Sequence, residues 1–169
     1  MPDTSLWPLL IVILLGCGLG VVNGFNDAAN AIATVIGTRV LSPRNALIMA
    51  GVLNFAGAAT GVQVARTIGK GILTPGAMSY EVAIAGLVSV ILWGALATVK
   101  GLPVSLTHGF VSGLAGAGMA ILGVNGVVWH AMWPILLWVI LAPLLGFIGG
   151  FAFMVALYWV FRRTHPSKV

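Results

Sequence analysis

Long stretches without charge are the feature that most constrains how this chain folds. No Asp, Glu, Lys or Arg occurs from Gly101 to Phe161. Three further apolar segments precede that stretch: Leu6 to Val22, Asn45 to Ala65 and Val82 to Val99. A helix that crosses a bilayer needs roughly 20 predominantly apolar residues, and backbone polar groups in lipid must be hydrogen-bonded internally. The sequence therefore predicts an all-α integral membrane protein, built as a polytopic helical bundle.

The distribution of charge excludes several classes of protein. Charged residues make up 7% of the sequence, whereas soluble domains contain about 25%. The eight Lys and Arg residues fall between the apolar segments rather than on one surface, as helix ends and loops at a membrane require. We therefore expect a multi-pass protein of the cell (inner or plasma) membrane that contacts the lipid bilayer and binds no nucleic acid.

Gly, Pro and basic residues divide the chain into four or five predicted spanning segments. The first apolar region, residues 5–37, is too long for one straight perpendicular span, so we expect a break at Asn23 and Gly24. The Ser-Pro in the turn 38–45 is expected to start a second helix, which runs to about Arg66.

Gly, Pro and basic residues also separate the remaining predicted segments. Residues 67–80 have the composition of an aqueous loop, and a third helix is expected to follow it. The apolar run then breaks at Gly101 to Ser105 and resumes as a helix to about Leu122, rich in the Gly and Ala that allow close helix packing. The last stretch, residues 127–161, exceeds the hydrocarbon thickness, so we expect it to be tilted, kinked at Pro143 or divided.

A polar stripe interrupts the first apolar region. Its members follow helical spacing: Asn23, Asn26, Asp27, Asn30 and Thr34. Asp27 is the only acid in any of the long apolar regions. A carboxylate there is destabilising unless it is protonated, paired or bound to a cation, and such residues mark ion or substrate pathways. We take four members as a candidate Na⁺ site: Asn23, Asn26, Asp27 and Asn30. The alternative is an N-cap near the lipid headgroups.

A second polar site follows the break and suits an anion. Pro103 favours the start of a helix, and Ser105 is a natural N-cap. The new helix would direct free backbone N–H groups and the positive end of its dipole toward a ligand, and the hydroxyls of Ser105 and Thr107 would add neutral donors. The alternative is a surface loop in which Ser105 merely caps a helix, and His108 has a structural role.

The two polar sites are chemically complementary. An ionised Asp27 cannot lie beside phosphate without a positive charge between them. A sodium ion or a proton on Asp27 would remove that repulsion, so anion binding would depend on cation binding. This dependence is the physical basis of symport.

Three segments resemble the first half of the PiT family of inorganic phosphate transporters. They are, in order, "GFNDAANAIATVIGTRVLSPRNALIMAGVLNFAGA", "VARTIGKGI" and "GLPVSLTHGFVSGLAGAGMA". The resemblance implies a cation-coupled phosphate symporter built from two inverted repeats with broken or re-entrant helices, each repeat carrying one copy of both motifs. It also implies that Asn26, Asp27 and Asn30 belong to the ion and phosphate pathway. Ser105 and Thr107 would contact phosphate at a re-entrant hairpin tip.

The sequence departs from the family pattern in three respects. Phe25 stands where the family usually has a small residue, and Leu106 replaces a hydroxyl residue that would be a phosphate donor. Only one copy of each motif is present, so we expect residues 1–169 to form a single transmembrane transporter domain that is one repeat, with the second repeat absent. That second repeat would lie in the same longer chain, in a partner chain, or in a second copy of this chain as an antiparallel homodimer.

These observations lead to one functional hypothesis and its alternatives. The hypothesis is symport of inorganic phosphate coupled to Na⁺ or H⁺, by a half-transporter or fragment that needs a second repeat and uses no cofactor besides the coupling ion. The alternatives are a non-transporting membrane scaffold or assembly subunit, and a transporter of another oxyanion such as sulfate. Enzyme activity is not expected, because the sequence shows no nucleophile and base pair and its three histidines are scattered.

Overall fold

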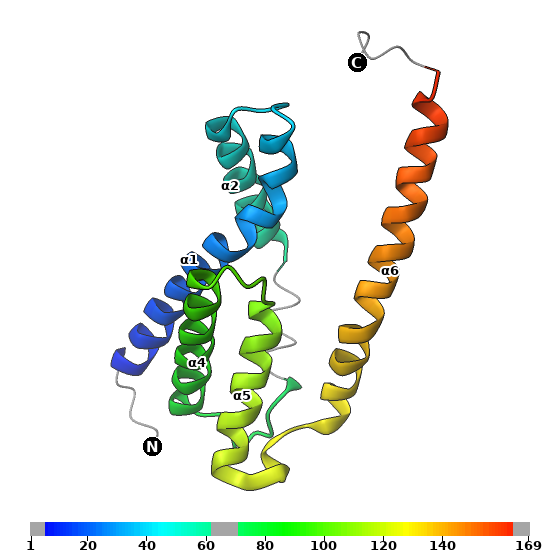
Figure 1. Cartoon of the computed structure of the whole chain (residues 1–169). Helices are drawn as coiled ribbons and strands as arrows, with labels where there is room; N and C mark the ends of the chain where they lie inside the picture. Colours follow the sequence, from blue (N-terminus) through cyan, green and yellow to red (C-terminus); the bar gives the residue numbers. More distant parts are fainter. Residues whose placement is uncertain (1–5, 62–70, 164–169) are drawn as a thin grey trace. The chain divides into compact units, whose positions relative to one another are not determined.

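The computed structural model describes residues 6–61 and 71–163, and every regular element in them is a helix (Figure 1). The helices are α1 (Leu6–Gly37), α2 (Pro43–Thr60), α4 (Tyr80–Val99), α5 (Leu106–Leu122), the 3₁₀ helix η1 (Gly123–Gly126) and α6 (Trp129–Phe161). Strand pairing in the described residues is limited to an isolated bridge between Leu73 and Val127. The all-α prediction is therefore confirmed.

Four of these helices are long and apolar enough to cross a membrane, counting only the described residues. They are α1, α4, the segment Leu106–Gly126 that combines α5 with η1, and α6. The chain divides into two compact units, residues 1–128 and 129–169. In the second unit, α6 is one undivided helix of 33 residues that contains Pro134 and Pro143.

The predicted break in the first helix is wrong. α1 runs without interruption through Asn23 and Gly24 and has 32 residues. A single helical Gly costs only about 1 kcal/mol relative to Ala, and the Ala-rich turns that follow favour the helix. At 1.5 Å per residue α1 is roughly 48 Å long, so it must tilt or extend beyond the hydrocarbon core.

The start of α2 agrees with the sequence, whereas its end does not. The Ser42 hydroxyl accepts a hydrogen bond from the backbone N–H of Asn45 at 3.4 Å, and Pro43 occupies the first helical turn. Proline is preorganised for that position, and it lacks only an N–H that would have no partner there. The helix ends at Thr60, with Gly61 as its C-cap, rather than near Arg66, which lies outside the described residues.

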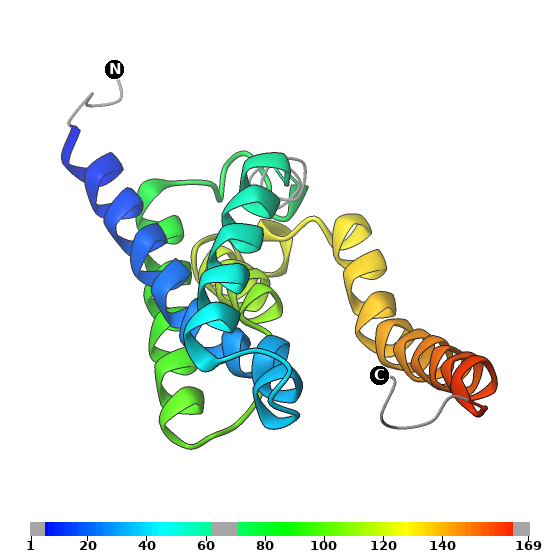
Figure 2. The same ribbon diagram turned by 90° about the horizontal axis from the view of Figure 1, so that it is seen from above.

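Helices α4 and α5 form an antiparallel pair held at close distance by glycines (Figures 1 and 2). A Cβ atom on Gly113 would overlap the Ser89 hydroxyl and lie 3.1 Å from the carbonyl oxygen of Gly86. A Cβ atom on Gly86 would in turn lie 2.8 Å from a methyl group of Leu114. The close packing predicted from the small residues is therefore confirmed, and it arises because van der Waals contact is the main attraction between helices in lipid.

Another glycine joins three segments of the first unit. A Cβ atom on Gly94 of α4 would overlap the Leu106 side chain and lie 2.9 Å from a methyl group of Val22 in α1. Leu106 is buried at 3% exposure. The Leu106 side chain therefore packs against α4.

The segment before α4 is more than an aqueous loop. Ile72, Leu73 and Ala77 are buried. The Thr74 backbone N–H donates to the Gly126 carbonyl at 3.1 Å, and the Val128 N–H donates to that of Ile72 at 2.9 Å. These apolar side chains cover the end of α5, which the sequence-based assignment of a solvated loop did not anticipate.

We expect Gly113→Ala to destabilise the protein, because the added methyl group has no space between α4 and α5. Overpacking of this kind costs about 1 to 3 kcal/mol. Gly116→Ala on the same helix is the matched control, since a Cβ atom there meets nothing within 4 Å. Thermal unfolding in detergent should show a lower midpoint for Gly113→Ala only. Equal midpoints for the two variants would contradict the packing described above.

Candidate functional site

The break between α4 and α5 is built by local backbone chemistry. Gly101 has a φ of +67°, and its N–H donates to the Thr98 carbonyl at 3.1 Å while the Leu102 N–H donates to that of Ala97 at 2.9 Å. This pair of bonds is the Schellman motif, which requires a residue in the left-handed region and is usually followed by Pro, here Pro103. The predicted break at Gly101 to Ser105 is therefore confirmed as the tip of a helical hairpin (Figure 1).

Ser105 is the N-cap of α5, as the sequence predicts. Its Oγ accepts the backbone N–H of His108 at 3.4 Å and lies 2.7 Å from the His108 Nδ1 atom. Ser105, Thr107 and His108 are all exposed. The first turn of a 17-residue helix thus presents its N–H groups and two hydroxyls on the surface of this unit.

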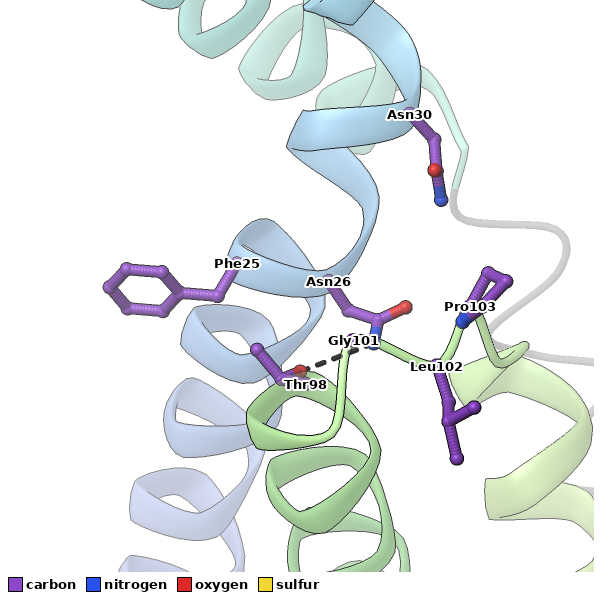
Figure 3. A pocket seen from close by; sticks show the side chains of 7 residues that line it. All are labelled: Phe25, Asn26, Asn30, Thr98, Gly101, Leu102 and Pro103. Atoms are coloured by element: carbon purple, nitrogen blue, oxygen red, sulfur yellow. Dashed lines mark hydrogen bonds between the residues drawn. The ribbon is translucent and has the colours of Figure 1, made fainter.

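A cavity of about 340 Å³ lies between α1 and the break (Figure 3). Its lining consists of Phe25, Asn26, Asn30, Thr98, Gly101, Leu102 and Pro103. Asn26 is 8% exposed, and its amide nitrogen donates to the Thr98 hydroxyl at 3.1 Å. The amide oxygen of Asn26 is buried and has no hydrogen-bond partner among the described residues.

The rest of the polar stripe lies elsewhere on α1. Asn23 and Asp27 line a separate cavity of about 490 Å³, to which α2 contributes Asn54. Consecutive helical residues point about 100° apart, so Asn26 and Asp27 face different neighbours. The structure therefore does not bring the four residues of the candidate Na⁺ site into one cavity. It pairs Asn23 with Asp27, and Asn26 with Asn30.

The residues predicted to bind the anion are on a third surface. Ser105 and His108 line a cavity of about 570 Å³ together with Ser89 and Trp93 of α4. Thr107 is exposed and lines none of the three cavities described.

Sequence reasoning missed four polar residues that line these cavities: Asn54, Ser89, Thr98 and Ser112. Each is an isolated polar residue within an apolar helical segment. This pattern could have identified it, because polar residues within membrane-spanning segments commonly line a cavity.

The donor set favours a hard cation over a transition metal. Within the described residues, no three His, Cys, Asp or Glu side chains are grouped as metal ligands. The cavities that adjoin α1 offer amide and hydroxyl oxygens and, in one of them, a single carboxylate. Oxygen ligands of this kind suit hard cations, whereas zinc and copper select imidazole and thiolate.

Comparison with known proteins places the fold among transporters. Residues 23–169 match the model of the phosphate transporter family. The chain is 40% identical over 173 residues to a probable low-affinity inorganic phosphate transporter of Streptomyces halstedii, covering 99% of the chain and 79% of that protein. It is 36% identical over 171 residues to a protein of the same description from Rhizobium meliloti, covering all of the chain and 51% of the relative.

A solved structure agrees with these sequence matches. The chain superposes on the sodium-dependent phosphate transporter with a TM-score of 0.84 and 34% identity. The match covers 95% of this chain and 42% of that one. The chain thus spans about half the length of the Rhizobium relative, and less than half of the solved transporter.

The Ser105 side chain caps α5, and two substitutions test how much this cap stabilises the helix. Ser105→Ala removes the N-cap and should cost about 0.5 to 2 kcal/mol, whereas Ser105→Asn keeps a capping oxygen without the hydroxyl. Thermal unfolding in detergent should therefore show a lower midpoint for Ser105→Ala than for Ser105→Asn. An equal loss of stability in both variants would show that the capping bond to His108 does not support α5.

Proposed function

Because the chain belongs to the phosphate transporter family, we propose that it forms one half of a symporter that carries inorganic phosphate across a membrane with Na⁺ or H⁺. The four helices of spanning length among the described residues make it a multi-pass membrane protein. The observation that carries the proposal is the hairpin tip. There Ser105 and Thr107 are exposed at the start of α5, and Gly101, Leu102 and Pro103 line a cavity together with Asn26 and Asn30 of α1.

The anion is proposed to bind at the start of α5. The free N–H groups of its first turn carry a partial positive charge, and Ser105 and Thr107 add hydroxyl donors. These donors suit the oxygens of phosphate. They suit sulfate equally, so the choice of oxyanion is an outcome of the experiment below.

The cation is proposed to bind along α1. Asp27 is the only acid in the apolar regions, and its carboxylate repels a phosphate unless a cation or a proton neutralises it. Asn23 and Asn54 line the same cavity and can supply neutral oxygen ligands. This neutralisation makes anion binding depend on the cation.

A second repeat is proposed to complete the site. Asp27 is exposed on this chain although α1 is an apolar helix of spanning length. Charged groups at membrane depth face protein or a water-filled cavity rather than lipid, and inverted-repeat transporters form their sites between two halves. The second repeat belongs to the same longer chain, to a partner chain or to a second copy. Coverage of 51% and 42% of the two longer relatives supports this proposal.

The test is uptake of radiolabelled phosphate by liposomes that contain the intact protein, meaning this chain with its second repeat. Uptake should require an inward Na⁺ or H⁺ gradient, and excess unlabelled phosphate should compete better than sulfate. Stronger competition by sulfate would reassign the substrate. A membrane scaffold predicts no uptake under any gradient, and a channel predicts uptake that ignores the cation gradient.

Asp27→Asn should abolish gradient-driven uptake and leave the protein folded, because it removes the charge and keeps the shape of the side chain. Glu81→Gln is the matched control, since Glu81 is an exposed acid in the first turn of α4 and lines none of the cavities described. Both variants should elute as the wild type does in size-exclusion chromatography. Unchanged uptake by Asp27→Asn would remove the carboxylate from the mechanism.

A further inference from the structure

The amide of Asn26 is held in one orientation by its neighbours. An Asn side chain can present either its NH₂ group or its oxygen to a partner, and the hydrogen-bond network decides which. Here the partner is the Thr98 hydroxyl, 3.1 Å from the amide nitrogen. Because Asn26 is only 8% exposed, water competes little for this bond.

Thr98 can only accept from Asn26, because its own proton is already used. The Thr98 hydroxyl donates to the Gly94 carbonyl one turn earlier in α4, at 2.8 Å. A hydroxyl has one proton, so the oxygen of Thr98 has only lone pairs left for Asn26. Flipping the amide would place two acceptor oxygens against each other without a proton between them. The chain of bonds from Gly94 through Thr98 therefore directs the Asn26 oxygen away from Thr98.

The other wall of the same cavity also lacks donors. The N–H groups of Gly101 and Leu102 are used in the Schellman motif that ends α4, and Pro103 has no N–H. The backbone of these three residues can therefore offer the cavity only carbonyl oxygens. Figure 3 shows Asn26 and the break on adjoining walls, with the Asn30 amide near Pro103. The cavity thus contrasts with the start of α5, where N–H groups are free.

We propose that Thr98 is a positioning residue that fixes the Asn26 amide so that its oxygen is a ligand for a small monovalent cation such as Na⁺. The buried oxygen has no partner among the described residues, and a cation would satisfy it. The cavity lining contains no titratable side chain, so the ligand is a metal cation rather than a proton. The inference rests on the proposed symport, and it adds a sodium site in the cavity between α1 and the break, separate from the cavity that contains Asp27.

The test is stabilisation of the purified intact protein by Na⁺ without phosphate, measured as the unfolding midpoint in NaCl relative to choline chloride at equal ionic strength. Thr98→Val keeps the shape of the side chain but frees the amide to turn. The Thr98→Val substitution should raise the half-saturating Na⁺ concentration roughly tenfold, because it removes the hydrogen bond that orients the Asn26 oxygen toward the cation. Thr98→Ser restores the hydroxyl and should restore the wild-type value.

Two further variants make the result specific. Thr60→Val on α2 is the matched control, because the Thr60 hydroxyl also donates to a carbonyl one turn earlier and lines none of the cavities described. It should leave the response to Na⁺ unchanged. Asn26→Leu removes the ligand oxygen and should abolish stabilisation by Na⁺. This variant tests the site independently if Thr98→Val does not fold.

Several results would overturn the inference. One is an unchanged half-saturating concentration in Thr98→Val, and another is a full response in Asn26→Leu. A wild-type protein that Na⁺ does not stabilise would also overturn it. If that protein still takes up phosphate under a proton gradient, the proposed function stands and only the sodium site fails.

Discussion

The end of α4 at Gly101 is the constraint on which the candidate site depends. Its two capping bonds use the N–H groups of Gly101 and Leu102, and Pro103 has none to offer. The chain then turns, and Ser105 caps a new helix whose first N–H groups are free. One short segment therefore has acceptors on the side of α1 and donors at the start of α5. Carbonyl acceptors suit a cation and free N–H donors suit an anion, so the proposed sites for the two ions lie on different residues of this segment.

Much of the fold could be predicted from the sequence, because helix caps, turns and close helix contacts depend on the residue types at those positions. The helix starts at Ser42 and Ser105, the break after α4 and the close approach at Gly113 all follow from residues within a few positions of the feature. The break expected at Asn23 and Gly24 was wrong because a single glycine does not end a helix whose following turns have high helix propensity.

The faces of the polar stripe could not be predicted in the same way. Which side of α1 meets α4 depends on the contact between Val22 and Gly94, residues 72 positions apart. That contact buries Asn26 against Thr98 and leaves Asp27 on the side of α2. Helical spacing showed that these polar residues lie near one another, but two neighbours on a helix can serve separate cavities. The structure shows that the polar residues of α1 are divided between two cavities, which the sequence did not predict.

The central claim is that phosphate binds beside the hairpin tip, at the start of α5. A cysteine at Val104, which lines the Ser105 cavity, tests this most directly in a Cys17→Ser background. The account predicts that a membrane-impermeant thiol reagent labels this cysteine from one side of the membrane only, and that phosphate with Na⁺ slows the labelling. Labelling at the same rate with and without phosphate, from either side, would contradict the account.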